Sequence, residues 1–143
     1  MMLMTATILL ALTALGGLTM AGIRFARGIN PPAWLAMLHG LLASAGLTLL
    51  IFDVFTRKVP APAILGMILF LAAAGGGAIL SLAYKWRQRL LPVWLVLGHA
   101  LLAVCALTLL ILAVQADHPE APASRSAEGG SGAGSRMAVF PPA

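Results

Sequence analysis

Four long apolar segments follow one another along the first 115 residues, and short polar stretches separate them. They cover roughly residues 4–23, 33–55, 61–84 and 91–115, and each is almost free of charged side chains. A helix needs about 20 apolar residues to cross the hydrocarbon core of a bilayer. Backbone polar groups in lipid must be satisfied within the segment, which favours helices over open strands. The pattern therefore predicts an all-α integral membrane protein with four transmembrane helices.

Composition agrees with lipid as the main surroundings of the chain. Of 143 residues, 61% are hydrophobic and 9% are charged. A soluble domain of this size leaves too much of its surface exposed to water to bury so many apolar side chains. The net charge of +5 would by itself be compatible with a nucleic-acid-binding protein. Here the basic residues lie at the ends of the apolar segments, where membrane topology explains them. We expect the lipid bilayer as a partner and no nucleic acid.

The second and fourth apolar segments are two versions of one sequence. Residues 31–54 and 91–114 are identical at 13 of 24 positions, counted directly along the chain. The identical residues include Pro32 with Pro92, Trp34 with Trp94 and His39 with His99. The same offset of 60 residues also pairs Gly16 and Gly17 with Gly76 and Gly77, and Arg27 with Arg87. The repeat predicts two tandem helical hairpins, residues 4–55 and 64–115, inserted in parallel.

The distribution of cations between the loops predicts the orientation. Five basic residues follow the first and third segments, and two follow the second: Arg24, Arg27, Lys85, Arg87 and Arg89 against Arg57 and Lys58. Cytoplasmic loops carry the excess of Lys and Arg. We therefore expect a bacterial-type inner membrane, with loops 1 and 3 cytoplasmic and both termini outside. In a parallel repeat, the two histidines then lie at one depth, nearer the inner face.

The remainder of the chain, residues 116–143, differs in composition from the transmembrane domain of residues 1–115. It is rich in Ala, Gly, Ser and Pro with scattered charge, so it lacks the apolar surface needed to order itself. We predict a disordered C-terminal tail. The single cysteine, Cys105, matches Ala45 in the first hairpin, which favours a packing role in a small-residue position.

The candidate chemistry of the chain is carried by His39 and His99. An ionisable side chain inside the hydrocarbon is a functional hypothesis by default. Two imidazoles at one depth can ligate one haem iron from both sides, and bundle cores accommodate such cofactors. The cations at the inner end are expected partners for the haem propionates: Arg24, Arg27, Lys85, Arg87 and Arg89. The specific hypothesis is haem b binding between the two helices, for electron transfer or redox sensing.

Other interpretations of the same residues stay open at this stage. A neutral histidine can hydrogen-bond across helices and do nothing else, as in a cofactor-free accessory or scaffold subunit of a larger membrane complex. A small permease, working as a homodimer, is a weaker alternative, because few polar residues are available to line a path. The chain contains no recognisable catalytic motif, so an enzyme is not expected. Zinc is disfavoured, because it needs at least three protein ligands.

Two further patterns predict helix contacts. Small residues recur every fourth position on the first and third segments: Thr13, Gly17, Ala21 and Ala73, Gly77, Ser81. Such stripes allow membrane helices to approach closely, which is our interpretation of them. Asp53 stands where the second hairpin has Ala113, four residues before Arg57. This spacing predicts an interfacial Asp53–Arg57 ion pair.

Overall fold

The computed structural model describes residues 1–117, and all of its regular elements are helical. They are α1 (Met2–Arg27), α2 (Ala33–Thr56), α3 (Ala61–Ile79), the π-helical turn η1 (Leu80–Lys85) and α4 (Val93–Asp117). Counting α3 with η1, four helices are long and apolar enough to cross a membrane. The predicted all-α fold, with four helices long and apolar enough to span a membrane, is confirmed. The predicted disordered tail lies outside the described residues from position 118 onward.

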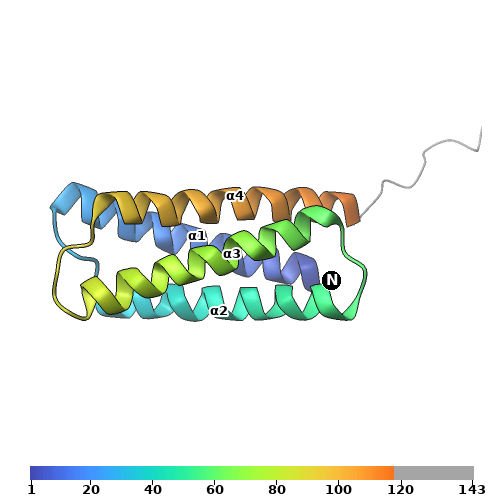
Figure 1. Ribbon diagram of the computed structural model, residues 1–143, viewed down its shortest axis with the longest axis horizontal. Coiled ribbons are helices and arrows are strands. Elements are labelled where there is room, and N and C mark those ends of the chain that lie inside the picture. The colour runs from blue at the N-terminus through green and yellow to red at the C-terminus, as the bar shows by residue number, and fades with distance from the viewer. Residues whose placement is uncertain (118–143) are drawn as a thin grey trace, which may run out of the picture.

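The helices lie side by side along the long axis of the bundle (Figure 1). Their contacts run round the bundle from α1 to α2, α3, α4 and back to α1. The most extensive contacts join α1 to α2 and α3 to α4. Helices α2 and α4 therefore occupy one diagonal of the bundle. The α1–α2 loop and the α3–α4 connection share one end, which we call the basic end because it carries Arg24 and Lys85.

Proline and glycine set several helix boundaries. Pro32 and Pro60 immediately precede α2 and α3, where their fixed φ suits the residue before a helix. Helix α1 ends at Arg27 and is followed by Gly28, whose φ of 66° is in the left-handed region. The fourth helix begins at Val93 rather than at residue 91, because Pro92 disfavours a helical conformation for the residue before it. The third span ends in a π-turn, which the sequence pattern does not predict.

The buried core lies mainly in the half of the bundle away from the basic end. Its members are Leu3, Ala6, Leu10, Leu50, Ala63, Phe70, Ala106, Leu110 and Ala113. Burial recurs at an offset of 60 residues, as Leu10 with Phe70 and Leu50 with Leu110 show. Nearer the basic end, Pro31 and Leu91 are buried, but most of the inward-facing residues are only half-buried, and this looser packing leaves room inside the bundle.

Glycine allows the closest approach between helices in this core. A Cβ added to Gly46 on α2 would lie 2.8 Å from Leu10 Cγ on α1, which is too close for carbon atoms. Between α3 and α4, a Cβ on Gly66 would lie 3.2 Å from the Ala106 carbonyl oxygen. In both cases, a side chain would push apart two helices that pack along their length.

We expect Gly46→Ala to lower the free energy of unfolding by about 1–3 kcal/mol, because the core must shift to admit the methyl group. Gly40→Ala is the matched control, since it lies on the same helix and a Cβ there meets nothing within 4 Å. The control is expected to be neutral or stabilising by up to about 1 kcal/mol, as alanine is the better helix former. Unfolding in detergent, followed by circular dichroism, compares the two. Equal stability of both variants would show that α1 and α2 do not meet at Gly46.

Candidate functional site

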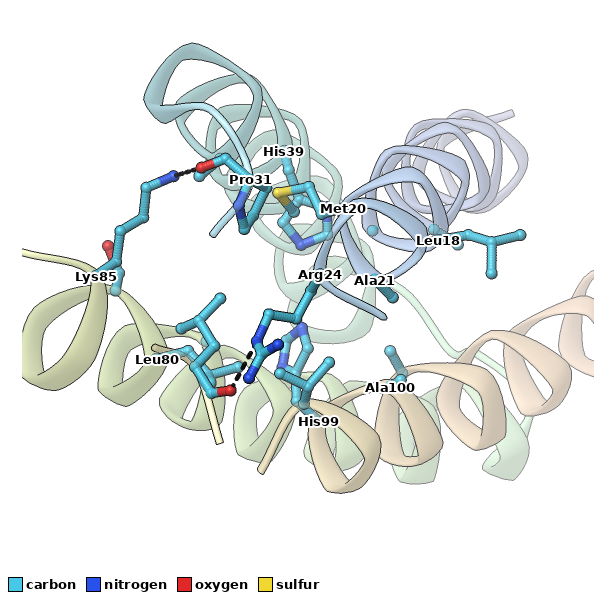
Figure 2. Close-up of a pocket in the computed structure, with 18 of the residues that line it drawn as sticks. Leu18, Met20, Ala21, Arg24, Pro31, His39, Leu80, Lys85, His99 and Ala100 are labelled. Atoms are coloured by element: carbon cyan, nitrogen blue, oxygen red, sulfur yellow. Dashed lines mark hydrogen bonds between the residues drawn. The ribbon is translucent and has the colours of Figure 1, made fainter. Parts of the chain in front are cut away.

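Two histidines face each other at the centre of the bundle. His39 comes from α2 and His99 from α4, and their side chains point toward the same central space (Figure 2). Their ring centroids are 6.2 Å apart, with an angle of 66° between the ring planes. The diagonal arrangement of α2 and α4 brings the imidazoles together across the bundle axis.

Each imidazole is fixed by a hydrogen bond to the backbone of a neighbouring helix. His39 Nδ1 lies 2.9 Å from the Thr13 carbonyl oxygen on α1, and His99 Nδ1 lies 2.8 Å from the Ala73 carbonyl oxygen on α3. A carbonyl oxygen only accepts hydrogen bonds, so Nδ1 is the protonated nitrogen in both rings. In the neutral form, Nε2 therefore keeps its lone pair available for another partner.

The small-residue stripes on α1 and α3 make room for the imidazoles. A Cβ added to Gly17 would lie 3.1 Å from His39 Cε1, and one on Gly77 would lie 3.3 Å from His99 Cε1. Glycine at these positions lets each ring lie against the neighbouring helix, within reach of the carbonyl one turn earlier. The other positions of the two stripes differ in exposure: Thr13 and Ala73 are buried, Ala21 is half-buried and Ser81 is exposed.

Two cavities meet at the histidine pair. One, of about 240 Å³, extends from the imidazoles toward the basic end, where Arg24 and Lys85 line it (Figure 2). The other, of about 200 Å³, extends in the opposite direction, and apolar side chains form most of its wall. Those apolar residues include Leu10, Leu47, Phe70 and Ala73. The site is therefore an apolar space with two imidazoles at its middle and two cations at one end.

Only two of the five cations predicted to serve this site reach the cavity. The Arg24 Nε donates to the Leu91 carbonyl oxygen over 3.0 Å. The Lys85 Nζ donates to the carbonyl oxygens of Pro31 and Pro32 at 2.9 and 3.0 Å. The other three are exposed and do not line the cavity: Arg27, Arg87 and Arg89.

A second charged cluster lies at the opposite end of the bundle. Arg57 donates to both carboxylate oxygens of Asp53, with Nη2 to Oδ2 at 2.7 Å, and to Asp117 Oδ2 at 3.1 Å. The hydrogen bonds that the Arg57 guanidinium donates to the Asp53 carboxylate raise the pKa of Arg57 above its ordinary value. The predicted Asp53–Arg57 pair is confirmed. Sequence reasoning missed Asp117, which ends α4 two residues inside the stretch predicted as tail.

The donor set restricts which metals the bundle suits. Within residues 1–117, no three His, Cys, Asp or Glu side chains gather in positions to hold a metal ion. Two imidazoles therefore suit a metal that brings its other ligands with it, as haem iron brings four porphyrin nitrogens. Cys105 is exposed on the surface of the bundle, so it does not belong to the core that residues 1–117 form.

Comparison with known proteins gives no further guidance to the site. No protein-family model matches the chain, and neither curated proteins nor solved structures give a significant match. The features that bear on function are the histidine pair, its backbone hydrogen bonds and the two adjoining cavities.

Proposed function

We propose that the protein binds one haem b, with His39 and His99 as the two axial ligands of the iron. The observation that carries this proposal is the separation of the ring centroids, 6.2 Å. Bonds of about 2 Å from a metal to each imidazole nitrogen, together with the size of the rings, place the two centroids about 6 Å apart. The rings are thus spaced for a single metal between them.

The hydrogen bonds of the imidazoles support the same role. Ligating histidines usually donate their other ring nitrogen to a carbonyl or carboxylate, which fixes the tautomer and raises ligand basicity. Here His39 and His99 each donate Nδ1–H to a backbone carbonyl. This arrangement leaves Nε2 as the nitrogen that binds iron in our proposal.

The cavities supply the space that a flat macrocycle requires. A porphyrin extends in all directions from its iron, so it needs room on both sides of the histidine pair. The cavities of about 240 and 200 Å³ lie on opposite sides of that pair. Together they fall within the usual range of cofactor sites, about 300–1,000 Å³. Their largely apolar walls suit the porphyrin body.

The finer architecture that we infer is a tandem repeat of two hairpins. Buried positions recur at an offset of 60, and both histidine–carbonyl hydrogen bonds span 26 residues. With the basic end cytoplasmic, in a bacterial-type inner membrane, the haem would lie near the inner face. One haem at that depth does not span the bilayer, so we propose electron exchange with a partner or redox sensing.

The second candidate is an accessory subunit without a cofactor. The two histidine–carbonyl hydrogen bonds join α2 to α1 and α4 to α3, so they stabilise helix pairs on their own. In this case the imidazoles serve only as polar contacts, and the protein acts by packing against a membrane complex.

Titration of the purified full chain with haemin, in detergent, distinguishes the two candidates. We expect saturation at one haem per chain and a six-coordinate, low-spin spectrum. Because both axial positions are occupied by imidazole, the reduced form should not bind carbon monoxide readily. Absence of saturable binding would contradict haem ligation and leave the accessory role.

A further inference from the structure

We propose that Arg24 and Lys85 form a two-cation anchor for the two carboxylates of the haem, with one cation from each hairpin. This inference rests on the proposed haem site and adds its orientation. The propionate edge lies at the basic end, and the apolar edge lies in the cavity lined by Leu10 and Phe70. The three exposed cations take no part in it.

The π-turn η1 positions Lys85 for this role. By the offset of 60 residues, the counterpart of Arg24 is Tyr84, and the counterpart of Lys85 is Phe25, which is 46% exposed. A π-helix has more residues per turn, so each residue advances less around the axis. Bonds from Trp86 N to Ser81 O and from Arg89 N to Tyr84 O, both 2.8 Å, show this wider turn. Because each residue of the π-turn advances less around the helix axis, the Lys85 side chain faces the cavity. Its position on the third span corresponds to that of Arg24 on α1.

The hydrogen bonds of the two cations confirm that they are counterparts in space. Arg24 donates to the carbonyl oxygen of Leu91, just before α4, and Lys85 donates to that of Pro31, just before α2. Leu91 and Pro31 are themselves 60 residues apart. Each cation thus reaches across to the other hairpin, and together they frame the basic end of the cavity.

The excess of positive charge at the basic end of the bundle favours an anionic ligand. In residues 1–117 the two carboxylates are Asp53 and Asp117, and both pair with Arg57 at the opposite end. The polar partners of Arg24 and Lys85 are neutral backbone carbonyls. Carboxylates form stronger, charge-assisted hydrogen bonds with such cations than carbonyls do. An amphiphile with two carboxylates beside an apolar body complements both the cations and the cavity.

A comparison of haem with its dimethyl ester tests the anchor, because the ester keeps the iron and the macrocycle but lacks both charges. We expect the wild-type chain to bind haem at least about tenfold more tightly than the ester. The Arg24→Gln/Lys85→Gln variant should bind both ligands equally, at the affinity of the ester. Each single variant should lose part of the preference. Arg27→Gln/Arg87→Gln, which changes two exposed cations, is the matched control and should keep it.

The outcomes separate the anchor from the haem site itself. Equal binding of haem and ester by the wild type overturns the anchor and leaves the histidine site standing. A preference that survives in the Arg24→Gln/Lys85→Gln variant also overturns it. A wild-type chain that binds neither ligand contradicts the proposed function, and the anchor falls with it.

Discussion

Replacement of either His39 or His99 with alanine is expected to abolish the low-spin, six-coordinate haem spectrum. Each variant leaves a single imidazole, and loss of one axial ligand opens a coordination position on the iron. Removal of groups that merely orient a metal ligand costs about 10–100-fold in affinity, so loss of the ligand itself should cost more than about 100-fold. Haemin titration of the purified variants in detergent measures the change.

His118 provides the matched control, because it is the third histidine of the chain and lies outside the described residues. His118→Ala should keep the wild-type spectrum and affinity. Added imidazole should partly restore the low-spin spectrum of His39→Ala and His99→Ala, since each substitution leaves space beside the cavities. If either alanine variant kept an unchanged six-coordinate spectrum, the bis-histidine assignment would be wrong.

Arg57→Ala is expected to cause the largest loss of stability among single substitutions at the charged cluster. Asp53 is 1% exposed, so removal of its cation leaves a buried carboxylate without a partner. Such breakage costs about 3–5 kcal/mol, and the lower end applies here because the Arg57 side chain is 36% exposed. Chemical unfolding in detergent, followed by circular dichroism, measures this loss.

The double variant Asp53→Ala/Arg57→Ala is the control for this explanation. It removes both partners, and it gives α2 the residue that α4 carries at Ala113, which is also buried. The double variant should therefore be more stable than Arg57→Ala alone, because no buried charge is left unpaired. If the double variant were less stable than Arg57→Ala, the cost would come from another contact of these side chains.

Hydropathy determines most of this fold, and for that reason most of it could be predicted. The requirement to satisfy backbone groups within lipid leaves helices as the solution for four long apolar segments. Prolines and Gly28 mark several boundaries in the sequence. The ends of α1 and α4 extend beyond the apolar windows, because hydrogen bonding continues into the interfacial region where hydropathy no longer indicates a helix.

The π-turn and its consequences could not be predicted. Residues 80–85 read as an ordinary continuation of an apolar helix, and nothing in their composition reveals the wider turn. Without it, the offset of 60 places Phe25 rather than Arg24 opposite Lys85. Which two of the five candidate cations line the cavity, Arg24 and Lys85, therefore depends on the three-dimensional structure.

The candidate site, like the fold, could be predicted from the sequence only in part. The two histidines stand out in the sequence, because ionisable residues are rare in apolar segments. The backbone carbonyls of Thr13 and Ala73 accept the hydrogen bonds of the histidines. Such acceptors cannot be recognised from the sequence, since every residue has a backbone carbonyl. Gly17 and Gly77 were recognisable in the sequence as members of the small-residue stripes. Such a stripe is equally compatible with room for an imidazole and with close packing of two helices.

The reduced-minus-oxidised optical spectrum of the purified wild-type chain tests the central claim most directly. The protein should be expressed with added haem and measured in detergent beside His118→Ala. The account predicts the sharp bands of a low-spin b-type haem, at one haem per chain, in both proteins. A colourless wild-type protein, folded by circular dichroism, would contradict haem binding between His39 and His99.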